Sequence, residues 1–244
     1  MEREFFSHPP KRAGSLTRLD RFGFNHAVTN STLIDGVRNV LRAHEVILVH
    51  FNTPATKHEI GYPQDLRDAL VNPTWKMCYS TIKAADRGPA QVGPGEQSAA
   101  FGSVGVLVDL GATTQIECVC NFDAGSNGRL SSEALGSLAT VESCEASIVD
   151  RVGHNEWLVA NAVPLGIFLF PASRVYVRAE DGEIEYDWGL VVQDFPEQRI
   201  FSKLQGVWQE FDRPTATWQP RTYDEIVVPP RSDSGARSTP VTAH

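Results

Sequence analysis

The segment from Asp150 to Val177 reads DRVGHNEWLVANAVPLGIFLFPASRVYV and holds the densest apolar sequence in the chain. A charged cluster stands directly before two apolar runs, WLVA and IFLF. Short apolar runs bounded by Gly and Pro are typical of buried strands. We therefore expect strands at 155–160 and 173–179, with IFLF between them.

Glu156 is the most informative charged residue of this segment. It follows Arg151 and His154 and begins the run WLVA. A carboxylate beside buried sequence has a raised pKa unless a cation or a donor pairs with it, and either Arg151 or His154 could supply that pairing. Such a carboxylate suits binding of a sugar hydroxyl or stabilisation of a cationic transition state. The alternative is a strand-start glutamate in water, with at most a weak ion pair.

Composition limits the class of protein. The chain has 244 residues, of which 41% are hydrophobic, and a formal net charge of -8. The acidic balance argues against a surface built wholly to bind a polyanion. No run approaches the ~20 apolar residues that cross a bilayer, and residues 1–15 lack the apolar core of a signal peptide. We therefore expect no membrane partner and a cytoplasmic location.

The four cysteines favour free thiols over a metal site. There is no CxxC pair, and the histidines lie far from the cysteines in sequence. Cys118 and Cys120 are two residues apart, so a strand would place both on one face without an ordinary disulfide between them. We expect no metal.

The remaining patterns predict a strand-rich α+β domain with a split, mostly antiparallel sheet and a few short helices placed early. Residues 1–20 have the composition of a flexible lead-in and residues 229–244 that of a disordered tail, which leaves one globular domain at 21–228. The expected helices span 31–43, 63–71, 131–140 and 199–211. The other expected strands span 45–51, 75–82, 104–110, 115–122, 183–193 and 222–230.

Two further features are candidates for function. Residues 84–103 contain three groups of turn residues, and a loop of this length is usually functional or disordered. His26 and Thr29 precede the first expected helix, where side chains and free backbone N–H groups can bind a ligand. His50 ends an apolar strand and is interpreted as a buried or boundary histidine with its hydrogen bonds satisfied.

Three segments together resemble the ADP-ribosyltransferase fold, in particular the DarT-type enzymes that modify DNA bases. They are His26 with Thr29 before a short amphipathic helix, VNPTWKMCYSTI at 71–82, and the Arg151–Val177 segment with its glutamate, apolar strand and Val-Pro pair. The resemblance is patchy across residues 24–178. The aromatic run that usually precedes the Pro-Met segment is missing.

This resemblance implies a split sheet around a cleft for NAD, which is consumed as a substrate. Glu156 matches the catalytic glutamate, and Arg67 is the candidate for the catalytic arginine. His26, Thr29 and Tyr79 are the candidates for contact with NAD. The acceptor is a nucleic acid or a protein, with DNA among the candidates, as in a toxin or defence effector.

Two other functions fit the same sequence. A non-enzymatic module, for instance an immunity or regulatory protein, would use the long loop, the tail and some of its tryptophans to bind a partner. A hydrolase would use His154 and Glu156 as acid and base.

Overall fold

The computed structural model describes residues 30–52, 62–72, 74, 76–100, 102–122, 137–170, 175–179, 182–186 and 188–228. The expected lead-in at 1–20, the expected tail at 229–244, and both His26 and Thr29 lie outside these residues. The described fold therefore begins at Asn30.

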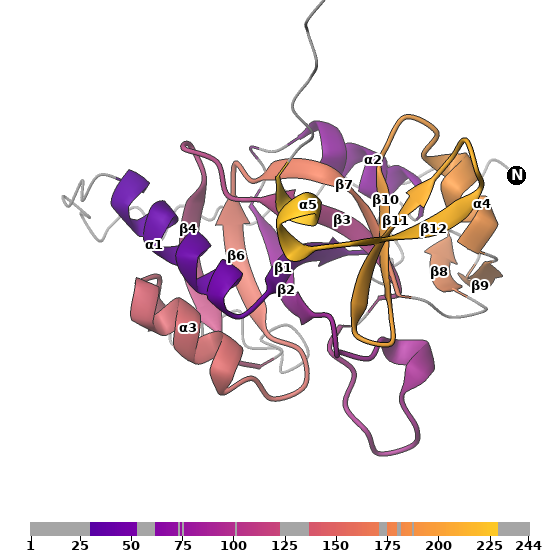
Figure 1. Cartoon of the computed structure of the whole chain (residues 1–244). Coiled ribbons are helices and arrows are strands. Elements are labelled where there is room, and N and C mark those ends of the chain that lie inside the picture. Colours follow the sequence, from indigo (N-terminus) through magenta and orange to yellow (C-terminus); the bar gives the residue numbers. More distant parts are fainter. Residues whose placement is uncertain are drawn as a thin grey trace, which may run out of the picture.

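Ten strands form one sheet in the order β12-β11-β10-β7-β3-β1-β2-β6-β4-β5, and a separate hairpin pairs β8 with β9 (Figure 1). Neighbouring strands are antiparallel except β7 and β10, which are parallel. The strands are β1 Val46–Phe51, β2 Met77–Lys83, β3 Val104–Asp109, β4 Gln115–Cys120, β5 Ser137–Leu138, β6 Glu156–Ala160, β7 Val163–Leu169, β8 Val175–Ala179, β9 Gly182–Tyr186, β10 Ile200–Leu204, β11 Val207–Asp212 and β12 Thr217–Arg221.

Five α-helices lie in the described part of the chain. They are α1 Asn30–Ala43, α2 Gln64–Val71, α3 Val141–Val149, α4 Trp188–Asp194 and α5 Tyr223–Val227. None of these helices is long and apolar enough to cross a bilayer. The predicted class, a strand-rich α+β fold with a mostly antiparallel sheet, is confirmed, although three of the helices come late in the chain.

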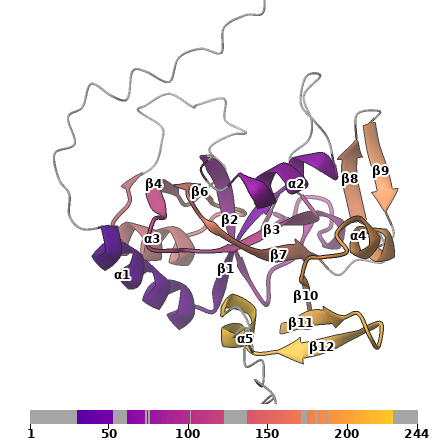
Figure 2. The ribbon, with the colours of Figure 1, turned by 90° about the horizontal axis from the view of Figure 1, so that it is seen from above.

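The predicted amphipathic helix before β1 is confirmed as α1. Ile34, Val37 and Leu41 of its apolar stripe are each at most 6% exposed. Helix α3 lies beside it in both views (Figures 1 and 2). Gly36, which weakens α1 by propensity, is where the two helices approach, because a Cβ built there would lie 2.6 Å from Val141 Cγ2.

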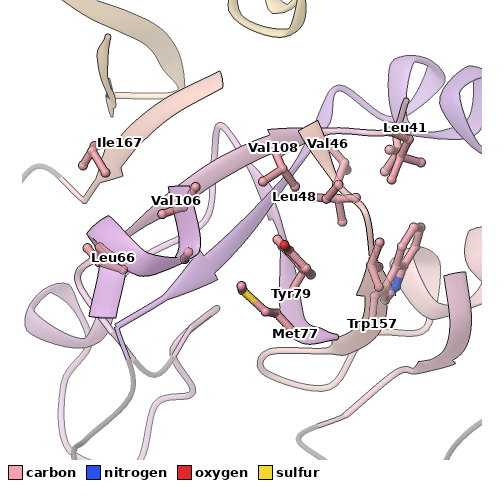
Figure 3. Packing of buried hydrophobic residues seen from close by; sticks show 14 of the residues in the cluster. Leu41, Val46, Leu48, Leu66, Met77, Tyr79, Val106, Val108, Trp157 and Ile167 are labelled. Atoms are coloured by element: carbon pink, nitrogen blue, oxygen red, sulfur yellow. The ribbon is translucent and has the colours of Figure 1, made fainter. Parts of the chain in front are cut away.

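Apolar side chains cover both faces of the central strands. Along β1, Val46 and Leu48 enter a core with buried residues of α1, α2, α3 and α4, and we call this side the helix face (Figure 3). Ile47 and Val49 enter a second core on the other side, with Phe168 and with Ala99 and Ala100 of the 84–103 loop. We call this side the loop face. Because strand side chains alternate, burial on both faces explains the unbroken apolar run of β1.

Of three predicted elements beyond residue 180, two are wrong and one is right only over its first residues. The expected helix at 199–211 is the hairpin of β10 and β11, because Gln205 and Gly206, with φ of 50° and 80°, form its turn. The apolar residues matched a helical period only because this turn interrupts two alternating strands. The expected strand at 183–193 becomes β9 followed by α4, and that at 222–230 becomes α5.

The sequence at the start of helix α5 contains a capping signal, although the apolar residues of this segment favour a strand. Thr222 and Glu225 form a reciprocal capping box, which satisfies free N–H groups in the first turn. The expected helix at 131–140 is also displaced: residues 131–136 lie outside the described part, 137–138 form β5, and α3 begins at Val141 after the capping residue Thr140.

Candidate active site at the fork of strand β2

Strand β2 changes its neighbour halfway along its length. Met77–Tyr79 pair with β6, and Ser80–Lys83 pair with β1. The strands β1 and β6 therefore separate from β2 at the Tyr79–Ser80 step, which we call the fork. Each half of β2 loses one neighbouring strand there, and its buried backbone groups need other partners.

Side chains supply these partners on the β6 side of the fork. Asn155 Oδ1 accepts hydrogen bonds from Thr81 N at 2.9 Å and from Thr81 Oγ1 at 2.8 Å. Arg151 Nη1 donates to the Thr81 carbonyl at 2.5 Å. Asn155 and Thr81 are both fully buried, and Asn155 Nδ2 donates to the Ser147 carbonyl of α3. The fork is thus fixed by side chains that replace a strand.

His50 has the corresponding position on the β1 side. Its Nδ1 lies 2.9 Å from the carbonyl oxygen of Cys78, and its ring lies 5.8 Å from that of Tyr79. Because a carbonyl oxygen only accepts, Nδ1 carries the proton. Burial lowers the pKa of the imidazole, so His50 is neutral at pH 7. The interpretation of His50 as a satisfied boundary histidine agrees with this contact.

Glu156 is the first residue of β6 and stands at the fork. The last pair between β2 and β6 is Tyr79 with Trp157, so Glu156 is one residue beyond the ladder. Trp157 is fully buried in the helix face. Since neighbouring strand residues face opposite sides, Glu156 belongs to the loop face and is half-buried there.

Cys120 of β4 is directly opposite Glu156. Burial is the main reason that the pKa of the Cys120 thiol is raised to about 11, and the nearby charges of Cys118 and Glu156 add to it. Cys120 also lines a hollow of about 260 Å³ between the end of β4 and α3. This volume is close to the lower end of the range for small-molecule sites. A larger hollow of about 380 Å³ lies between α1 and α5, and neither hollow is lined by Glu156 or by another predicted site residue.

The 84–103 loop reaches the segment that leads into Glu156. A Cβ built at Gly153 would lie 3.0 Å from Gln97 Oε1, so the loop packs closely there. Arg151 pairs with Asp86 at the root of this loop, at 2.5 Å, and each side chain is 12% exposed. The sequence made Arg151 a possible partner of Glu156, but in the structure Arg151 forms an ion pair with Asp86.

The other predicted residues do not gather around Glu156. Tyr79 is 4% exposed in the helix-face core, near Met77 and Leu48, and therefore faces the opposite side of the sheet (Figure 3). Burial raises the pKa of its phenol to about 12. Arg67 of α2 donates to the Asp194 carbonyl at 3.0 Å and lies over the Phe195 ring, so it ties α2 to the end of α4. The placement of His26 and Thr29 is not described.

Sequence reasoning missed Asn155, Thr81 and Asp86. Asn155 is the first residue of the predicted strand at 155–160 and directly precedes β6, but an asparagine at such a place commonly marks a turn. Its function as a substitute for a strand depends on residue 81, which is distant in sequence. In the described ranges, no group of three or more His, Cys, Asp or Glu side chains is arranged to hold a metal ion.

Comparisons with protein-family models, with curated proteins and with solved structures found no match for this chain.

Proposed function

We propose that this protein is an NAD-dependent ADP-ribosyltransferase-like enzyme with Glu156 as its catalytic carboxylate. One observation carries the proposal: Glu156 begins β6 at the fork, where β6 and β1 leave β2. The fork gives the carboxylate a fixed backbone position at the point where β2 exchanges one neighbouring strand for the other. On the loop face, the 84–103 loop packs against the segment that leads into Glu156 and supplies a cover for a ligand there.

The reaction needs a carboxylate in such a position. Nicotinamide leaves the ribose of NAD⁺ as the sugar gains oxocarbenium character. Glu156 would accept a hydrogen bond from the ribose 2′-hydroxyl and face the developing positive charge. An acceptor nucleophile then attacks the anomeric carbon and releases its proton. The acceptor is a nucleic acid or a protein, and the formal net charge of -8 limits any DNA contact to a local surface.

The assignment of the other residues follows from their contacts. Arg67 and Tyr79 have no part in the proposal, because one holds α2 to α4 and the other is buried on the helix face. His26 and Thr29 stay predictions for contact with NAD. The Arg151–Asp86 pair positions the loop root and the fork.

The test compares two matched glutamates. Glu117 of β4 is also half-buried and pairs with Lys76 at 2.5 Å, away from the fork. We expect Glu156→Gln to lower nicotinamide release from NAD by about 100-fold or more, and Glu117→Gln to stay within about threefold of wild type. Equal rates for wild type and Glu156→Gln in folded protein contradict the assignment.

A partner-binding module is the second candidate, and one surface favours it. Trp188, Phe211 and Trp218 form a half-buried cluster of rings with centroids 5.3 to 5.6 Å apart, and Trp218 belongs to the edge strand β12. Large aromatic side chains at an accessible edge are typical anchors of protein interfaces.

Thermal unfolding with NAD separates the two candidates. A ligand at 100 times its dissociation constant that binds only the folded state raises the free energy of unfolding by about 2.7 kcal/mol. The enzymatic function predicts a rise in melting temperature with NAD. An unchanged melting temperature at saturating concentrations favours the module.

A further inference from the structure

Lys203 of β10 is a buried charged residue that takes no part in the hydrogen bonds at the fork. It is 4% exposed, and its side chain lies on the loop face, below the 84–103 loop. Among the described residues, Nζ donates one hydrogen bond, to the Ala84 carbonyl at 2.8 Å, and it lies 5.5 Å from the centre of the Phe170 ring. An ammonium has three N–H groups, so a single carbonyl and an aromatic ring leave it poorly solvated.

The charges around Lys203 do not compensate it. Asp86 and Arg151 are the charged groups that act on it. Both oxygens of Asp86 are already engaged, one by Arg151 Nη2 and the other by the backbone N–H of Lys83. Two cations therefore share one carboxylate in a partly dehydrated place. Burial first, and then Arg151, lower the pKa of Lys203 to about 8 against the opposing effect of Asp86.

We propose that Lys203 is an amine nucleophile that forms an imine with small aldehydes or ketones admitted below the 84–103 loop. The neutral amine attacks the carbonyl carbon, and the carbonyl oxygen takes up a proton to give a carbinolamine. Loss of water then gives the C=N bond, so the amine and the carbonyl compound become an imine and water without an oxidant or reductant. Asp86 stabilises the protonated imine by its charge.

The loop contacts suggest the path of entry. The tip at Gly93–Gln97 is exposed, whereas Ala99 and Ala100 are buried. Gly88 packs so closely on Phe170 that a Cβ there would lie 2.4 Å from Phe170 Cγ. The Ala84 carbonyl that holds Nζ is at the root of the same loop. Local opening of the loop would break the hydrogen bond between the amine and the Ala84 carbonyl and would expose the amine at the same time.

The test is reductive trapping with acetaldehyde and cyanoborohydride at pH 7, with the modified lysines mapped by mass spectrometry. With a pKa of about 8, about one Lys203 in ten is neutral at pH 7. About one in 2,500 is neutral for a lysine with the ordinary pKa of about 10.4. The larger neutral fraction favours reaction at Lys203, and its burial offsets part of this advantage over Lys76, whose side chain is 52% exposed. We therefore expect Lys203 to be ethylated at least ~10-fold faster than Lys76.

Two controls connect the rate to the folded site. In denaturing urea, Lys203 and Lys76 should react at equal rates. Gly88→Ala, which moves the loop off Phe170, should raise the rate at Lys203, whereas Gly93→Ala at the exposed loop tip, where a Cβ makes only ordinary contacts, should leave it within about twofold of wild type. Trapping at Lys203 no faster than at Lys76 in the folded protein overturns the proposal, as does a preference for Lys203 that persists in urea.

Discussion

Replacement of Asn155 by alanine removes three hydrogen bonds from the fork in one step. The amide oxygen accepts from Thr81 N and from Thr81 Oγ1, and the amide nitrogen donates to the Ser147 carbonyl. At about 1 kcal/mol for each bond, the loss is about 3 kcal/mol. The partner groups at Thr81 and Ser147 are buried and would be left without hydrogen bonds. This penalty brings the expected loss in the free energy of unfolding to about 3–5 kcal/mol.

Urea unfolding followed by tryptophan fluorescence measures this change. For a domain of this size, about 3 kcal/mol corresponds to a fall of about 6–12 °C in melting temperature. Asn39→Ala on the exposed side of α1 is the matched control and should change stability by less than about 0.5 kcal/mol. Thr81→Val combined with Asn155→Ala should show a coupling energy of about 1–2 kcal/mol. An Asn155→Ala protein within about 0.5 kcal/mol of wild type refutes the claim that this side chain holds the fork.

Three further predictions concern packing and pH. Gly36→Ala should destabilise the protein by about 1–3 kcal/mol in urea unfolding despite the better helix propensity of alanine, because the new Cβ meets Val141 Cγ2, and Val141→Ala should restore most of the loss. Lys203 has a pKa of about 8 in the folded state, so it loses its proton at a lower pH in the folded protein than in the unfolded protein. The free energy of unfolding of wild type relative to Lys203→Met should therefore rise by up to about 3 kcal/mol between pH 8 and 10.5. A difference that does not change with pH contradicts this. His50 has a lowered pKa, so the unfolded state binds its proton first and stability should fall as the pH drops below about 6.5; His50→Gln should flatten that part of the profile.

The sequence pattern predicted the central strands β1, β2 and β3, because their burial is recorded directly in apolar runs, but it assigned no strand to β7 at Val163–Leu169. The run VILVHF became β1 and VGVLVD became β3, each buried on both faces. The failures have local causes. A turn at Gln205–Gly206 made two strands resemble a helix, and the capping box at Thr222 and Glu225 was masked by a segment rich in β-branched residues.

The site was harder to predict than the fold. Glu156 was chosen as a candidate because a charge stood directly against an apolar strand, and the structure places it at the fork. Arg67 was chosen by its place in the sequence, which does not determine where a helix directs its side chains. The Lys203–Asp86–Arg151 cluster joins residues from three distant segments, so no local pattern could indicate it.

The most direct measurement of the proposed catalytic function is an experimental structure of the protein with NAD bound. We predict that the nicotinamide ribose lies at the fork, with its 2′-hydroxyl about 3 Å from the Glu156 carboxylate. A dinucleotide bound elsewhere on the protein, with Glu156 out of hydrogen-bonding range of the ribose, would contradict this prediction.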